Sequence, residues 1–567
     1  MSAAKAKTTK SAKKARYTTT IKKSGVAKLP KTPLKKTVYL LASGDLRPSA
    51  NQKCWAAQEA MEAALTRAVK ELGYTVIRAH AYKPSEQHGF ISSQKEGIEV
   101  FANMNPKIPV IVAESVWQYS NHVFPGLLTH EGPILTVANW SGTWPGLVGM
   151  LNLNACLSKA GKPFSTLWSA DFTDKWFLER LEKWLKTGVV RHTTSQVSPL
   201  KRLAVPVKDR QLGEKLAAEF RAKKSILGIF DEGCMGMYNA IIPDELLFPI
   251  GVFKERLSQS ALYYATTQVS DEEARDVYRW MMAKGMVFQL GEDPETELTL
   301  QQVLWQCKMY IAAVRMADEF GCAAIGIQYQ QGLKDLLPAG DLAEGMLNNA
   351  DRPPVRVADG GRVLFEGKPV VHFNEVDEPA GLDALLNNRV AAALGQPLET
   401  TLHDVRWGDF DPTGSVKEFV WAFQISGAVP PAHLEGGWKG AESVRQSPTY
   451  FRLGGGTLRG ICKPGEIVWS RIFVERGRLC LDIGRGRSVR LPYEEVRRRL
   501  HTCSQEWPIM NAVLNGVSRD QFMARHRSNH IQVIYANSAK EADRLLAVKA
   551  AMAAALGIEV SLCGIVH

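Results

Sequence analysis

The chain has 567 residues, enough for two to four domains that each bury a core. Hydrophobic residues make up 45% and charged residues 23%, as in ordinary globular proteins, and no apolar run reaches the ~18 residues that a membrane-spanning helix needs. The net charge of +12 comes from residues 1–36, which hold 12 Lys and Arg and no Asp or Glu. The rest of the chain is neutral, which makes nucleic acid an improbable substrate.

Residues 1–36 consist largely of Lys, Ala, Thr and Ser and show no apolar pattern. We expect them to form a disordered, solvated basic tail. A weak arm that binds anions or nucleic acid is the alternative interpretation.

Nine cysteines are scattered along the chain, none of them in a Cys-x-x-Cys pair, and no signal peptide precedes them. This pattern predicts reduced thiols in a cytoplasmic protein. It indicates neither a disulfide framework nor a thiolate zinc site.

Strands and helices alternate from Thr37 onward. Short apolar or β-branched runs predict strands at Val38–Ala42, Thr75–Arg78, Val110–Ala113 and Ile134–Ala138. An amphipathic helix is expected between the first two, over Asn51–Leu72. Strand, helix and strand at this spacing are typical of parallel βαβ units, so we place a first α/β domain at residues 37–203.

The alternation starts again after residue 203 and predicts a second α/β domain over residues 204–370. Its expected elements are Lys208–Lys224, Ser225–Phe230, Gln301–Phe320 and Ala323–Tyr329. Beyond the expected helix Pro379–Leu394, short strands with Gly-rich turns predict a β-rich C-terminal domain over residues 371–567. Its elements are expected at Glu466–Phe473, Leu479–Ile483, Ser488–Leu491 and Ala539–Leu556. The fold class is therefore α/β, with two doubly wound α/β domains before the β-rich domain.

The common catalytic signatures are absent: there is no Gly-x-Ser-x-Gly elbow, Walker loop or His-Glu-x-x-His helix. Gly454–Gly456 and Gly484-x-Gly486 are Gly-rich, but neither follows a strand and opens a helix. Both are expected to be turns rather than phosphate-binding loops.

Three polar residues near element ends are the candidates for chemistry. Glu344 follows Pro338 in a short helical start, Asp377 precedes a helix, and His530 adjoins the expected strand Ile531–Tyr535. Each has a structural alternative: a solvated carboxylate for Glu344, a helix cap formed by Asp377 or its neighbour Glu378, and a structural or exposed histidine for His530. Together, two carboxylates and one imidazole suit a hard divalent ion such as Mn²⁺ or Mg²⁺.

Several short blocks, distributed from Thr37 to the C-terminus, match one known family. They are Arg47-Pro48, Trp117-Gln-Tyr119-Ser120, Asn139-Trp-Ser-Gly-Thr-Trp144-Pro145-Gly146, Cys234-Met-Gly-Met-Tyr238-Asn239-Ala240, Pro338-Ala-Gly-Asp-Leu-Ala-Glu344, Glu375-Val-Asp377, Asp404-Val-Arg406, Tyr450-Phe-Arg452, Trp507-Pro508 and Ser528-Asn529-His530. In these blocks the chain resembles the L-fucose isomerases and, more loosely, the L-arabinose isomerases.

The resemblance implies a metal-dependent aldose–ketose isomerase acting on a deoxyhexose or a pentose through an enediol. It implies a Mn²⁺ ion held by Glu344, Asp377 and His530, with Glu344 and Asp377 also serving as the catalytic acids and bases. Arg47, Trp117, Tyr450 and Asn529 are the implied contacts to the monosaccharide. The resemblance also implies a fucose isomerase-like fold of three domains, assembled as a hexamer with active sites between subunits.

The chain departs from the family pattern at substrate-side positions. Ser49-Ala50-Asn51 replaces an acidic and Gly-containing stretch, Asn121-His122-Val123 replaces acidic and Thr residues, and Thr457 stands where an aromatic residue is expected. Sugar identity is therefore open, and Arg47 or His122 could meet an anionic or larger group.

Two other functions fit the same residues. One is a sugar-binding or regulatory homologue without catalysis, and the other is a metal-dependent sugar epimerase that shares the enediolate intermediate. Retention of paired carboxylates argues against a protein that only binds sugar.

Overall fold

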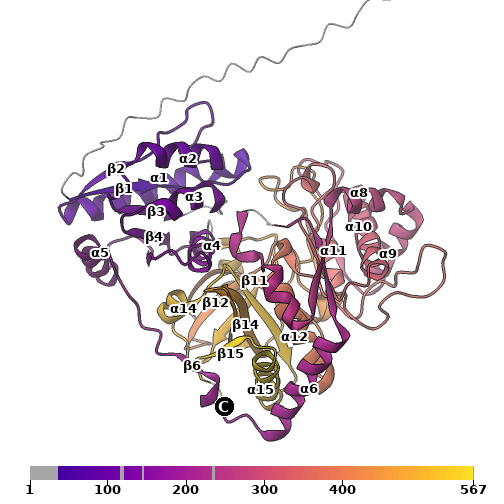
Figure 1. Cartoon of the computed structure of the whole chain (residues 1–567). Coiled ribbons are helices and arrows are strands. Elements are labelled where there is room, and N and C mark those ends of the chain that lie inside the picture. The colour runs from indigo at the N-terminus through magenta and orange to yellow at the C-terminus, as the bar shows by residue number, and fades with distance from the viewer. Residues whose placement is uncertain (1–35, 115–119, 144–145, 233–235, 566–567) are drawn as a thin grey trace, which may run out of the picture.

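A computed structural model describes residues 36–114, 120–143, 146–232 and 236–565. The chain forms two parallel α/β sheets and a C-terminal region dominated by an antiparallel, barrel-like sheet (Figure 1). Within the described ranges, no helix is both long and apolar enough to cross a membrane.

The first domain is a parallel five-stranded sheet in the order β2-β1-β3-β4-β5. Its strands are β1 (Thr37–Leu41), β2 (Thr75–Arg78), β3 (Val110–Glu114), β4 (Ile134–Asn139) and β5 (Ser165–Ser169). Its helices are α1 (Pro48–Glu71), α2 (Gln94–Asn103), α3 (Phe124–Thr129), α4 (Gly146–Lys159) and α5 (Lys175–Thr187).

This first sheet is covered on both faces. Val38 and Leu40 of β1 pack with α1 and α5, whereas Tyr39 and Leu41 pack with α2, α3 and α4. Successive strand residues point to opposite faces, so a continuously apolar strand must be buried on both sides. The doubly wound arrangement expected from the sequence is therefore present in this domain.

The second domain has a parallel three-stranded sheet in the order β10-β7-β8. Its strands are β7 (Ser225–Phe230), β8 (Val252–Leu257) and β10 (Ala324–Ile327). Its helices are α6 (Val207–Lys223), α7 (Asp244–Leu247), α8 (Gln259–Gln268), α9 (Asp271–Ala283), α10 (Leu300–Glu319) and α11 (Asp341–Leu347). A separate parallel pair is formed by β9 (Val287–Phe288) and β13 (Glu442–Ser443).

The C-terminal sheet runs in the order β14-β17-β11-β12-β16-β15-β18-β6, and β14 also pairs with β15. This additional pairing closes six of the strands into a barrel. The strands are β6 (Val197–Pro199), β11 (Thr400–Phe410), β12 (Phe419–Gln424), β14 (Gly465–Glu475), β15 (Arg478–Ser488), β16 (Met510–Leu514), β17 (His530–Ala536) and β18 (Glu559–Cys563). The helices are α12 (Glu378–Leu394), α13 (Tyr493–Thr502), α14 (Arg519–Arg525) and α15 (Ala539–Ala555).

The barrel also receives elements from earlier in the chain. β6 pairs with β18 although its residues precede position 203, and α6 packs against α15. From the first domain, α4 contacts β11 and β14 of the barrel, beside which it lies in Figure 1. The three regions thus share contacts instead of meeting only at single linkers.

One expected pair of strands is wrong. In place of separate strands at Leu479–Ile483 and Ser488–Leu491, β15 continues from Arg478 to Ser488 and contains both Gly484 and Gly486. A Cβ on Gly484 would lie 2.6 Å from the carbonyl oxygen of Cys563 and 2.7 Å from the Trp469 ring. Gly484 therefore permits close strand packing and does not form a turn. Gly454 and Gly455, by contrast, adopt φ values of +68° and +105° in a turn, as expected.

We predict that Gly484→Ala destabilises the protein by about 1–3 kcal/mol, because the added methyl group has no space. Urea unfolding followed by barrel tryptophan fluorescence measures the loss. Gly477→Asn is the matched control: Gly477 also lies beside β15, has φ +68°, and has open space around a Cβ. Equal midpoints for Gly484→Ala and the wild type would contradict this packing explanation.

Candidate metal centre and substrate cavity

The candidate site lies where the second domain meets the end of the barrel. Gln328–Gln330 follow the carboxyl end of β10, and His530 at the start of β17 lies directly opposite Asp404 of β11. Ligand sites of open α/β sheets form beyond the carboxyl ends of their strands. The fold therefore gathers polar residues that are far apart in the sequence into one buried cluster.

The segment that leads into α12 has an unusual backbone. Phe373 N–H donates a hydrogen bond to the carbonyl of Ile325, which places this segment beside β10. Glu375 and Val376 then adopt φ values of +59° and +53°, in the left-handed region that non-glycine residues rarely occupy. Such strain is concentrated at functional sites, where the surrounding structure holds it in place. Here it turns the Glu375 side chain toward His530.

Asp377 supports His530 from the Nδ1 side. Its Oδ1 accepts a hydrogen bond from the Ala380 amide and caps α12, which confirms the capping alternative for this residue. Its Oδ2 lies 2.7 Å from both Arg471 Nη1 and His530 Nδ1. Burial opposes ionisation, but Arg471 and His530 hold the pKa of Asp377 well below its usual range. Asp377 is therefore an anion with both oxygens engaged.

The other ring nitrogen of His530 faces two more carboxyl groups. Nε2 lies 3.3 Å from Glu375 Oε2 and 3.4 Å from Asp404 Oδ1, yet neither contact has hydrogen-bond geometry. Burial alone would lower the pKa of His530, but its interactions with Asp377, Asp404 and Glu375 raise it well above the ordinary value. The buried Nε2 atom therefore lies between the carboxyl oxygens of Glu375 and Asp404 without a hydrogen bond to either.

Glu344 brings another carboxyl group from α11. Asn374 Nδ2 donates a hydrogen bond to its Oε2, whereas its Oε1 is buried without a hydrogen-bond partner. Burial, together with the carboxyl groups of Asp341 and Glu375, raises the pKa of Glu344 well above its usual value. Burial likewise raises the pKa of Glu375, whose Oε1 accepts a hydrogen bond of 2.6 Å from Gln330.

The cluster carries more acid than its cations can neutralise. Its carboxyl groups belong to Asp341, Glu344, Glu375, Asp377 and Asp404, each at most 1% exposed, and its cationic groups are Arg471 and His530. Glu344 Oε1, Glu375 Oε2, Asp404 Oδ2 and His530 Nε2 are all buried without hydrogen-bond partners. Buried charge of this kind calls for protons or a bound cation.

These atoms are the oxygen and nitrogen ligands that Mn²⁺ and related ions prefer. Among the described residues, however, no group of three or more His, Cys, Asp or Glu side chains is placed so that it could hold a metal ion. The donor set therefore fits a divalent ion in chemistry, and its side chains would have to draw together to coordinate one.

A cavity of about 390 Å³ adjoins this cluster through Gln330. Two of the predicted substrate contacts, Arg47 and Tyr450, line the cavity, and the Arg47 guanidinium lies 4.5 Å from the centre of the Tyr450 ring. Asp45 fixes Arg47 through bonds of 2.8 and 2.7 Å. The volume is that of a small-ligand site.

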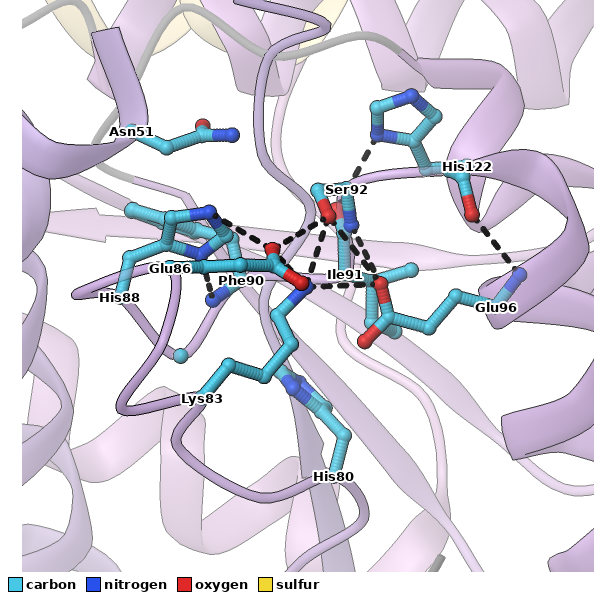
Figure 2. A network of polar contacts seen from close by, with 12 residues as sticks. Asn51, His80, Lys83, Glu86, His88, Phe90, Ile91, Ser92, Glu96 and His122 are labelled. Carbon is cyan, nitrogen blue, oxygen red and sulfur yellow. Dashed lines mark hydrogen bonds and ion pairs between the residues drawn. The ribbon is translucent and has the colours of Figure 1, made fainter. Parts of the chain in front are cut away.

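A polar network around Lys83 in the first domain (Figure 2) lies behind the Arg47 loop. Lys83 Nζ contacts Ser92 Oγ at 2.7 Å and Glu96 at 2.9 Å, which fixes the segment that contains Ile91. Ile91 in turn bonds with the backbone of Ala42 and Gly44, just before Arg47. His122, considered above for an anionic group, lies 3.1 Å from the Ile91 carbonyl, and burial lowers its pKa to about 4. At neutral pH His122 is therefore an uncharged part of this scaffold.

The structure brings most of the predicted site residues together. Asp377 contacts His530, Glu344 lies in the same buried cluster, and Asn529 Nδ2 contacts Asp404 Oδ1 at 3.3 Å. Trp117 lies outside the described residues. Glu375 and Asp404 had no predicted role, although both belong to blocks that carry the family resemblance. The metal-ligand role of Asp377 stays a prediction. The geometry favours Glu375 over Asp377 as the carboxylate ligand, because Glu375 lies on the Nε2 side of His530.

Comparison with known proteins adds no identification. No family model matches the chain, and no curated protein matches it. The isomerase family therefore stays a prediction from the quoted residues.

Asp341 provides a pH-dependent test of the buried acids. Burial raises its pKa to about 7, against ~3.9 in an unfolded chain. Its contribution to stability is complete below pH ~4 and is lost as the pH rises to about 7, by about 1.4 kcal/mol per pH unit. In metal-free buffer we expect the urea midpoint of the wild type to fall over this range relative to Asp341→Asn. Parallel midpoint curves would show that Asp341 does not titrate in this way.

Proposed function

We propose that the protein is a metal-dependent aldose–ketose isomerase that converts a deoxyhexose or pentose through an enediol. The supporting observation is the set of unpartnered buried atoms on Glu344, Glu375 and His530, next to a cavity of monosaccharide size. A protein that only binds a sugar has no need for an acid cluster of this kind. The resemblance to L-fucose isomerases supports the same reaction independently of the geometry.

In this proposal Glu344, Glu375 and His530 hold a divalent cation, Mn²⁺ by resemblance. Asp377 holds His530 through Nδ1, the outer carboxylate–histidine pairing that orients imidazole ligands in metalloproteins. Asp404 offers a further carboxylate oxygen beside Nε2. When bound, the ion would polarise the carbonyl and hydroxyl oxygens of the sugar and thereby make its C2 proton more acidic.

The chain's own residues would bind and orient the sugar. Arg47 and Tyr450 form one wall of the cavity, and Gln330 links it to Glu375. Asn529 Oδ1 is buried without a partner and is available to a sugar hydroxyl group. Trp117, which lies outside the described residues, keeps its predicted role as a sugar contact.

Proton transfer between C2 and C1 needs a carboxylate that takes the proton from one carbon and returns it to the other. Glu344 and Glu375 are the candidates: as ligands of the cation both would be ionised, although without an ion burial and the carboxyl groups of Asp341 and Glu375 raise the pKa of Glu344, and burial raises that of Glu375. An acid with a pKa closer to neutral both accepts and returns a proton more readily than an ordinary carboxylate. One of these two carboxylates would take the proton from C2 and deliver it to C1, and the other would accept the proton that O2 releases and pass it to O1.

We predict that Glu344→Gln lowers kcat at least ~10²-fold, the usual contribution of a general acid or base. A panel of aldoses is incubated with the protein in Mn²⁺ or in EDTA, and products are separated by chromatography. The wild type should form a ketose in Mn²⁺ and none in EDTA, and the exposed-acid control Glu366→Gln should match it. A near-normal rate in Glu344→Gln would reject its role. An epimeric aldose would identify an epimerase, and no conversion would favour the binding homologue.

Titration calorimetry with Mn²⁺ separates ligands from supporting residues. We expect Asp377→Asn to weaken Mn²⁺ binding about 10–100-fold, as removal of an outer partner does. Glu375→Gln and His530→Gln should weaken binding more than this, because each removes a direct donor. Normal binding by Glu375→Gln together with none by Asp377→Asn would return the ligand role to Asp377.

A further inference from the structure

A second cavity, of about 250 Å³, shares Tyr450 with the candidate substrate cavity. It lies between the end of α13 and the barrel strand β11, and a buried arginine, Arg406, forms part of its wall. The described residues that line it include Lys53, His501, Ser504, Glu506 and Trp507.

Arg406 is only 2% exposed, yet no carboxylate in the described parts of the chain forms an ion pair with it. Its Nη2 donates a hydrogen bond of 3.3 Å to Ser504 Oγ, and the guanidinium lies 5.0 Å from the centre of the Trp507 ring. Its Nε is buried without a hydrogen-bond partner. Among the other buried arginines, Arg471 and Arg499 have carboxylate partners. Arg352 and Arg445 instead each donate to several backbone carbonyl oxygens.

An uncompensated buried guanidinium costs several kcal/mol, and water can hydrate it but cannot neutralise its charge. The guanidinium stays charged at all physiological pH values and presents a planar fork of donors that matches phosphate and carboxylate oxygens. Lys53 and His501 add basic groups around the cavity, and Glu506 is the acid among its described lining residues. The local charge therefore favours an anion.

This cavity is also tied to the candidate metal centre. Gln424 is paired with Asp404 across β11 and β12, and both side chains of such a pair lie on one face of the sheet. The Gln424 side chain bonds with the backbone N–H and C=O of Ser504, at 3.2 and 2.9 Å. Ser504, the partner of Arg406, is thus fixed to the strand pair that carries Asp404.

We propose that Arg406 binds an anionic group, phosphate or carboxylate, carried by the aldose substrate. This rests on the proposed isomerase function, and the shared Tyr450 wall gives the anionic end a place beside the reacting end. The substrate class is then an aldose phosphate or a sugar acid instead of a neutral sugar.

Binding of inorganic phosphate to the full chain, followed by ³¹P NMR titration, tests the anion site without any need for catalysis. We expect saturable binding to the wild type, at least ~10-fold weaker binding to Arg406→Gln, and unchanged binding to Arg478→Gln. Arg478 is the matched control because its side chain is 62% exposed on the barrel surface. Absence of wild-type binding at about 10 mM phosphate, well above a ~1 mM Kd, would overturn the proposal whether or not Arg406→Gln folds.

Rates with matched sugars then test the link to the substrate. D-arabinose 5-phosphate is compared with D-arabinose, and D-galacturonate with D-galactose, in Mn²⁺. We expect one anionic sugar to have a kcat/KM at least ~10-fold above that of its neutral partner. Arg406→Lys keeps the positive charge but loses the forked pair of donors, so we expect it to reduce this preference, mainly by raising KM. Equal kcat/KM within both pairs would overturn the substrate assignment. If only the neutral sugars are converted, the isomerase proposal stands and the anionic-substrate assignment is rejected. If phosphate binds through Arg406 but no sugar is converted, the isomerase proposal is rejected and the anion site stands.

Discussion

The buried carboxyl groups around His530 impose the condition on which the site depends. Five acids lie at most 1% exposed, and Arg471 and His530 are the cations in contact with them. Ionised carboxylates in such surroundings repel one another strongly, so the folded chain must hold protons there or bind a cation. In the chain without an ion, the pKa values of Glu344, Glu375 and Asp341 are raised, so these groups hold protons more strongly than ordinary carboxyl groups do. The same condition would make the site a binding place for a divalent metal.

The fold supplies this arrangement at a cost in local strain and polar burial. Glu375 and Val376 hold positive φ angles, and several donor atoms remain unpartnered in the core. Other buried charges are paired, as Lys549 is with Asp383 and Arg525 with Asp482. The candidate metal centre and the Arg406 cavity are two neighbouring places where buried polar atoms lack partners. A substrate with an oxygen-rich end and an anionic end would complement both.

Much of the fold could be predicted because its strands are short, apolar and bounded by clear breaks. β2 and β7 match the expected ranges residue for residue, and α1 and α10 differ from theirs by a few terminal residues. β15 could not be predicted as one strand, because the pattern of its glycines also suits a turn and the close approach of Cys563 is a tertiary contact. Local sequence contains no information on such a contact.

The candidate site was predictable in composition but not in geometry. Glu344, Asp377 and His530 do meet in one cluster. The sequence could not show, however, that the backbone turn at Glu375 places this side chain at Nε2 of His530 and leaves Asp377 at Nδ1. The most direct test of the account is a crystal structure of the full chain soaked in Mn²⁺, with anomalous scattering recorded at the manganese edge. The account predicts one strong peak within about 2.0–2.3 Å of His530 Nε2 and of Glu344 and Glu375 oxygens. A peak elsewhere, or none at saturating Mn²⁺, would contradict it.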